Sequence, residues 1–211
     1  MHSVKKSAIA LAMLAIAGAS QAQQAATSSS PTGRLGQRYV GTSYGFANYQ
    51  DAREEFHDVS IGVNLPVGKS VDLDFGYGYQ WLTNNPVSLD GHSLDAGATL
   101  YTSTHGVKPF ASASLAHLWS KASYHGVTAR DDESFYAVSV GVEVPVAKII
   151  LTPSVGVQDS LNDGGDPTYA GGIDAHYWVT SKVGLRAAIS YSDYGSGLKS
   201  WNYRLGARVK F

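Results

Sequence analysis

The feature that most constrains this chain is an alternation of apolar and polar residues that recurs along most of its length. In residues 71–82, VDLDFGYGYQWL, one set of alternate positions holds valine, leucine and four aromatic residues. The other set holds mainly aspartate, glycine and glutamine. The same alternation returns at 136–144 and at 201–211. A period of two places the two sets on opposite faces of a β-strand, so the sequence predicts an all-β fold.

Ten alternating segments are expected, joined in turn by short turns and by longer polar loops. They are residues 37–47, 55–65, 70–82, 92–102, 107–120, 133–145, 149–159, 168–179, 183–192 and 200–211. The longer loops are expected at 48–54, 83–91, 121–132, 160–167 and 193–199. This arrangement is typical of an up-and-down antiparallel barrel, and an even strand number brings both chain ends to the short-turn side. An eight-stranded barrel with two misread segments is the alternative.

The chemistry of the two faces indicates which one lies inside. The polar face is mostly glycine, serine and aspartate, with few lysines or glutamates. Small residues suit a crowded interior and weaken a strand on an open surface. The apolar face carries aromatic residues near the strand ends, as in the interfacial girdles of membrane barrels. The girdle residues are Tyr44, Phe46, Tyr79, Trp81, Trp119, Tyr177, Tyr191 and Trp201. We therefore expect a transmembrane barrel with an apolar exterior; an exported soluble β-barrel or sandwich is the alternative.

The amino-terminal residues predict export. Residues 1–22 combine Lys5 and Lys6 with an apolar stretch too short to span a bilayer and a small-residue cleavage site. These features are typical of a secretory signal peptide. Residues 23–36 are small and polar and are expected to form a flexible leader before a barrel at 37–211. The small acidic excess left after cleavage does not favour nucleic-acid binding. The chain has no cysteine, which excludes disulfides and cysteine-based metal sites.

The last strand carries a pattern of its own. Arg204, Gly206, Val209 and Phe211 resemble the carboxy-terminal signature of bacterial outer-membrane proteins. Residues 38–52, RYVGTSYGFANYQDA, are similar to the first strand and loop of the small outer-membrane β-barrel superfamily that includes OmpA-type, OmpX-type and porin-like proteins. The resemblance implies location in the outer membrane of a Gram-negative bacterium. It also implies periplasmic chaperones and the barrel-assembly machinery as partners, with the last strand as the assembly signal.

Charged residues on the polar face are expected to form a network in the lumen. They are Asp58, Asp72, Asp74, Asp95, Glu143, Asp174, His176, Arg186, Arg204 and Arg208. Acidic residues come mainly from the early strands and basic residues from the late ones, so the two groups face each other across the lumen. The sequence predicts a largely salt-bridged lumen that forms a narrow, porin-like channel for small solutes. The alternative is a closed barrel with a structural or surface-interaction role.

A hydrolase is the third and weakest hypothesis. His57, His92, His125 and Ser123 are expected near the outer rim, with Asp58 and Asp132 nearby in sequence. No spacing groups these residues, and the chain contains no HExxH or nucleophile-elbow pattern. The seven histidines are scattered. We expect no enzymatic activity, no metal site and no cofactor.

Overall fold

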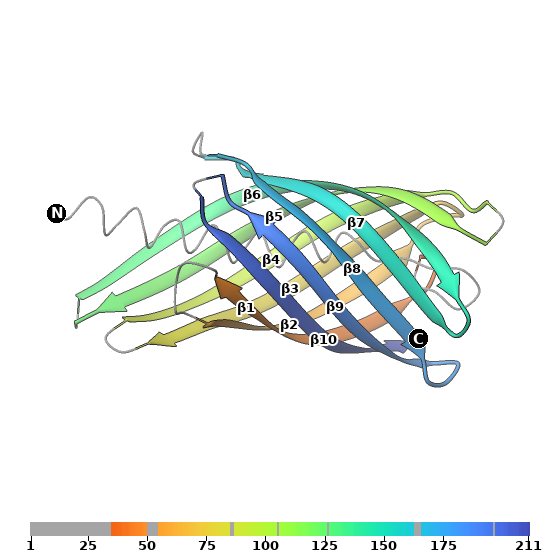
Figure 1. Ribbon diagram of the computed structural model, residues 1–211, viewed down its shortest axis with the longest axis horizontal. Coiled ribbons are helices and arrows are strands. Elements are labelled where there is room, and N and C mark those ends of the chain that lie inside the picture. The colour runs from red at the N-terminus through yellow and green to blue at the C-terminus, as the bar shows by residue number, and fades with distance from the viewer. Residues whose placement is uncertain are drawn as a thin grey trace.

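The chain forms a closed antiparallel barrel of ten strands (Figure 1). The computed structural model describes residues 35–49, 55–84, 87–104, 106–125, 127–162, 166–195 and 197–211. The strands are β1 (Tyr39–Tyr49), β2 (Glu55–Pro66), β3 (Val71–Asn84), β4 (Val87–Tyr101), β5 (Lys108–Tyr124), β6 (Val127–Val146), β7 (Ile149–Ser160), β8 (Thr168–Trp178), β9 (Val183–Asp193) and β10 (Lys199–Lys210). Each strand pairs with its neighbours in sequence, and β1 pairs with β10 to close the sheet. The ten-strand prediction is confirmed and the eight-strand alternative is wrong.

The barrel is apolar outside and polar inside. Leu115, Val155 and Leu205 point outward and are 59%, 60% and 65% exposed. Ser139 and Arg204, at inward positions of their strands, are 4% and 3% exposed. Because the sheet is closed, its backbone donors and acceptors pair within the wall and leave no edge along the barrel. Among the described residues, no helix is long and apolar enough to cross a membrane.

Inward glycines let side chains from other strands fill a narrow lumen. A Cβ atom at Gly141 would meet the Phe110 ring at 2.5 Å and the backbone oxygen of Pro153 at 2.7 Å. At Gly206 it would meet the backbone oxygen of Thr42 at 2.6 Å. These contacts explain why glycine alternates with large outward residues along the strands. The barrel is therefore closely packed around Gly141 and Gly206.

Two of the loops expected from the sequence are strand instead. The predicted loops 83–91 and 121–132 are largely absorbed into β3–β4 and β5–β6, which continue their pairing as far as Asn84↔Val87 and Tyr124↔Val127. Figure 1 shows the β5–β6 hairpin reaching beyond the others at the end of the barrel opposite the carboxy terminus. The apolar–polar alternation fades in residues 127–132 of β6, where every residue is exposed and neither face is buried. This part of β3–β6, residues 82–84, 87–92, 117–124 and 127–134, is called the sheet extension below.

Residues 1–22, the predicted signal peptide, lie outside the described residues. Residues 23–34 of the predicted leader also lie outside them. The last two leader residues, Leu35 and Gly36, are described and lie inside the turn-side end of the barrel.

Candidate functional site

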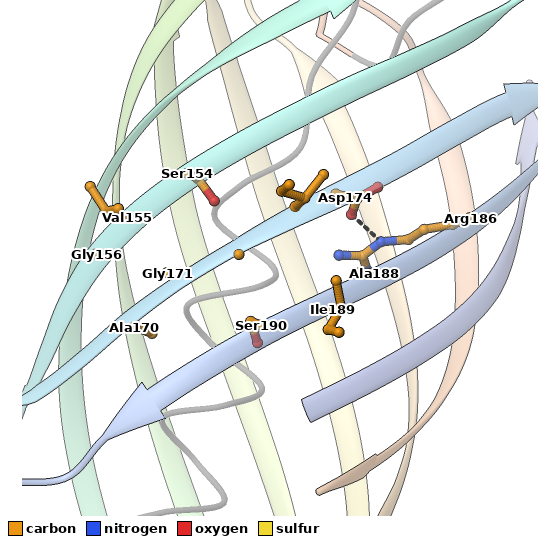
Figure 2. Close-up of a pocket in the computed structure, with 12 residues that line it drawn as sticks. Ser154, Val155, Gly156, Ala170, Gly171, Asp174, Arg186, Ala188, Ile189 and Ser190 are labelled. Carbon is orange, nitrogen blue, oxygen red and sulfur yellow. Dashed lines mark hydrogen bonds and ion pairs between the residues drawn. The ribbon is translucent and has the colours of Figure 1, made fainter. Parts of the chain in front are cut away.

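The middle of the lumen holds charged side chains that interact between adjacent strands or between strands one apart. The Arg204 guanidinium donates from Nη2 to both carboxylate oxygens of Asp58, each at 2.8 Å. Arg186 donates from Nε to Asp174, which lies diagonally from it on the neighbouring strand β8 (Figure 2). Arg208 Nη1 lies 3.1 Å from His176 Nδ1. Charge-assisted bonds of this kind satisfy ions that would otherwise be costly to bury.

All ten residues predicted for the charge network occupy inward positions. Eight of them are at most 9% exposed: Asp72, Asp95, Glu143, Asp174, His176, Arg186, Arg204 and Arg208. Asp58 keeps 16% side-chain exposure, and Asp74 accepts a bond from Thr99 Oγ1 at 3.4 Å. The structure thus places the acidic and basic groups in one compartment, where Asp58–Arg204 and Asp174–Arg186 form direct ion pairs.

Two small cavities lie in the wall and lumen around these ions. One of about 70 Å³ is lined by Asp74 and Asp95 on one side and by Arg186 and Arg208 on the other. The other, of about 20 Å³, lies beside the Asp174–Arg186 pair (Figure 2). Both are polar enough, and large enough by volume, to hold ordered water. Each is a chamber on the scale of a few water molecules.

The turn-side end of the lumen is closed by the segment that precedes β1. Leu35 is 1% exposed and packs with Phe110 and Tyr101. The backbone N–H of Gly36 donates to both carboxylate oxygens of Asp72, at 3.2 and 3.0 Å. Gly36 has a φ of 79°, which glycine adopts readily and other residues rarely do.

Two further side chains hold the same segment. Asn64 Nδ2 donates to the backbone oxygen of Gln37 at 2.8 Å and to Asp72 at 2.9 Å. Lys108 Nζ donates to the backbone oxygen of Leu35 at 3.2 Å. Residues 35–37 with these partners are called the turn-side clasp, and its centre is Asp72, whose exposed fraction is 0%.

The loop-side end of the lumen is closed by apolar side chains from most of the strands. The loop-side cluster comprises Ala47, Tyr49, Phe56, Leu82, Leu89, Leu118, Ala122, Phe135 and Tyr194, all at most 7% exposed. Tyr194 lies just after β9, and its hydroxyl is 2.9 Å from Ser200 Oγ. Burial raises the pKa of the Tyr194 phenol above its ordinary value of 10.0. The cluster excludes water from this end of the barrel.

The aromatic residues predicted to form girdles lie on the outer face. Seven of them are near the loop side and Tyr177 is near the turn side. Several touch across strands: Phe46 stacks on Tyr203 with ring centroids 4.9 Å apart, and Tyr191 lies 5.2 Å from Trp201. Their exposure ranges from half-buried to 44% for Tyr44 and Trp119.

The candidate hydrolase residues do not come together. His57 and His92 lie on the outer face with their Nδ1 atoms 2.8 and 2.6 Å from the hydroxyls of Tyr44 and Tyr77. Asp58 follows His57 in sequence but lies on the opposite face of the wall. Ser123 Oγ is 3.1 Å from Thr128 Oγ1, within the sheet extension.

The structure instead brings Asp132, one of these candidates, near His117 and Ser134, which the sequence pattern did not single out. His117 Nδ1 lies 2.8 Å from Ser134 Oγ, and its Nε2 lies 4.0 Å from an Asp132 oxygen. The second distance exceeds a hydrogen bond, so no relay joins the three groups. Within the described residues, no three His, Cys, Asp or Glu side chains are arranged to hold a metal ion.

The residues of the carboxy-terminal pattern lie on both faces of β10. Arg204 and Gly206 point inward, whereas Val209 and Phe211 are 50% and 65% exposed on the outside. The Phe211 N–H donates to the backbone oxygen of Arg38 at 3.3 Å, beside the β1–β10 seam. The predicted role of these residues in assembly stays a prediction.

Sequence reasoning missed both closures of the lumen. The loop-side cluster had a usable signal, because Phe56, Leu82 and Phe135 are large apolar residues at inward positions of otherwise polar faces. The turn-side clasp had only a weak signal, because Leu35 is a single large apolar residue in a leader that is otherwise small and polar.

Comparison with known proteins shows the fold and no closer relationship. No family model matches the chain, and no curated protein sequence matches it. Among solved structures, the β domain of the Bordetella autotransporter BrkA gives a TM-score of 0.50 at 15% identity, covering 83% of this chain and 99% of that one. Neisserial surface protein A gives 0.49 at 18% identity, covering 82% and 97%. The attachment invasion locus protein Ail of Yersinia pestis gives 0.45 at 11% identity, covering 83% and 99%.

The predicted likeness to outer-membrane β-barrels is therefore confirmed at the level of the fold, with no particular member matched. At such low identity, the comparison does not assign a role to any residue of this chain.

Proposed function

We propose that this chain is an integral outer-membrane barrel with a closed lumen whose function is surface interaction through the sheet extension. The membrane placement is supported by the outward apolar side chains, of which Leu115, Val155 and Leu205 are examples. Strands of 11 residues or more are long enough to cross a bilayer when tilted. The predicted export signal and carboxy-terminal pattern favour the outer membrane over other membranes.

The observation that carries the closed lumen is its obstruction at both ends. On the loop side, Phe135 and Leu118 are 1% and 2% exposed within an apolar cluster. On the turn side, Leu35 is 1% exposed within the clasp. A permeating ion would have to cross both closures and the ion pairs between them, at a high cost in desolvation.

The sheet extension supplies a surface for binding. Residues 127–132 of β6 pair with β5, but in the described part of the chain no strand pairs with their other edge, because β6 meets β7 only from Phe135 onward. An unpaired edge can bind an extended peptide by adding a strand. Arg130, Asp131 and Asp132 discourage pairing between copies of this edge. They leave room for a partner segment of complementary charge.

A matched deletion tests the binding role. Leu118 and Glu133 are paired across the hairpin, so removing residues 119–132 and joining them through Asn-Gly preserves the register of the remaining strands. We expect bacteria that display the intact protein to adhere to epithelial cells more than bacteria that display the shortened one. Heat-modifiable migration on SDS-PAGE checks that both proteins fold. Equal adhesion by the two would contradict the proposed role of the extension.

Planar-bilayer recording tests the closed lumen separately. The purified, folded protein is expected to give no conductance steps. The chamber between Asp74, Asp95, Arg186 and Arg208 is the one observation that favours the narrow channel instead. Reproducible steps from the intact protein would favour that second function and overturn the closed lumen.

A further inference from the structure

A groove of about 570 Å³ interrupts the apolar outer face over β6–β9. Its lining includes Val138, Val140, Val155, Tyr169, Gly171 and Tyr191. The register puts Val140, Val155, Gly171 and Tyr191 in one row across four strands. The groove therefore arises where one member of a row of large side chains is glycine.

Packing inside the protein does not require a glycine at position 171. A Cβ atom there would meet only Val155 Cγ1 at 3.5 Å and the backbone oxygen of Ser154 at 3.8 Å, which are ordinary contacts. Its neighbour Gly172 faces inward, and a Cβ there would meet the backbone oxygen of Ile189 at 2.6 Å. Glycine within a strand costs stability and often marks the close approach of a ligand or another backbone. Gly171 thus indicates an occupant from outside the chain.

The groove changes in character along its length. The row nearest mid-barrel is formed by valines and Gly171, whereas the loop-side row reaches Tyr169 and Asp193. Asp193 forms an ion pair with Lys199 at 3.6 Å, and both side chains stay about 40% exposed. An apolar slot that ends at an exposed pair of opposite charges complements a molecule with an apolar tail and a polar head.

We propose that this groove binds the acyl chain of a membrane lipid from the loop-side leaflet, with the lipid head group against the Asp193–Lys199 pair. The inference rests on the membrane placement proposed above. The acyl chain would lie over Gly171 between Val155 and Tyr191, where a second protein would have to insert a narrow apolar ridge.

The test uses the full protein in phospholipid vesicles that contain a lipid with a photoactivatable diazirine in its acyl chain. After irradiation, cross-linked peptides are mapped by mass spectrometry. We expect cross-links to concentrate on the peptides around Val155 and Gly171 and to fall several-fold in Gly171→Leu, which fills the groove. Ala113→Leu is the matched control, because Ala113 is also a small outward residue but lies on β5 and does not line the groove. This control should leave the cross-links unchanged.

Other results would overturn the inference. Cross-links spread evenly around the barrel, or equal in Gly171→Leu and the intact protein, would show that the groove does not retain a lipid. A chemically cross-linked dimer that Gly171→Leu abolishes would assign the groove to a second copy instead. If Gly171→Leu does not fold, Val155→Phe fills the groove from the neighbouring strand. Recovery of the intact protein outside the membrane fraction would defeat the membrane placement itself, whereas an embedded protein with even labelling would defeat only the groove.

Discussion

The two ends of the lumen are closed in different ways. At the loop side, nine buried apolar residues from β1 to β6 and from the segment after β9 pack against one another. At the turn side, one leucine outside the strands is held by hydrogen bonds that converge on a single carboxylate. The first closure is a small hydrophobic core, and the second is a docked piece of chain.

This difference determines what each closure contributes. The loop-side cluster forms whenever its strands pair, because its members are part of the strands, so it should contribute mainly to stability. The turn-side clasp involves residues that precede β1 and that β1–β10 pairing does not need. The clasp should therefore be separable from the barrel, and removing it should expose the lumen without unfolding the sheet.

The largest effect is expected from Phe135→Ala in the loop-side cluster. Removing a ring that is 1% exposed leaves a cavity among residues held by five other strands and the segment after β9. The free energy of unfolding should fall by about 3 kcal/mol. Guanidinium unfolding of the detergent-solubilised protein measures the change. Val127→Ala, at an apolar position that is 73% exposed, is the control and should change stability little. A loss below that of the control would mean that the cluster is not a core.

Asp72→Asn in the turn-side clasp is expected to lower stability less than Phe135→Ala does. It should have a larger effect on the access of water-soluble reagents to the turn-side end of the lumen. The substitution replaces the carboxylate that accepts from the Gly36 N–H and from Asn64. The free energy of unfolding should fall by about 1–2 kcal/mol. In a Leu35→Cys background, a water-soluble maleimide should label the cysteine faster when Asp72→Asn is present. Asp166→Asn, at an exposed position, should leave the labelling rate unchanged. Unchanged labelling in Asp72→Asn would show that the carboxylate does not hold the segment.

The sequence predicted the architecture because the period-two alternation is a property of local residues. The ten strands and the inward charges, such as Asp58 and Arg204, follow from that alternation and from the chemistry of the two faces. The alternation could not define where β5 and β6 end. Residues 127–132 of β6 pair with β5 but are exposed on both faces, so no apolar alternation marks them as strand. Strand pairing there is stabilised by the neighbouring strands and is invisible in a single segment.

The closures of the lumen depended on information that is not local. Leu35 packs against Phe110 and Gly36 donates to Asp72, and these contacts join residues 36 positions or more apart in sequence. Leu118 and Phe135 looked like isolated exceptions to a polar face, yet in the barrel they converge with residues from other strands. Such convergence requires the register of several strands together, which a strand-by-strand analysis does not supply.

The smallest effect distinguishes the two ends by pH. Burial raises the pKa of Tyr194, in the loop-side cluster, above its ordinary value of 10.0. Below pH 10 the phenol is protonated in both the folded and the unfolded chain, and its contribution to stability is fully present. Above pH 10 the unfolded chain loses the proton first, so it binds fewer protons than the folded chain and stability falls as pH rises. The slope from this one group cannot exceed about 1.4 kcal/mol per pH unit.

Tyr194→Phe removes the titrating group, so its stability should fall less steeply between pH 10 and pH 11 than that of the intact protein (a window set by the ordinary pKa). Guanidinium unfolding at the two pH values measures both slopes, with Tyr124→Phe, on the half-exposed hairpin tip, as the control. Parallel slopes in Tyr194→Phe and the intact protein would mean that water reaches the phenol and that the loop-side end is less dry than the turn-side one.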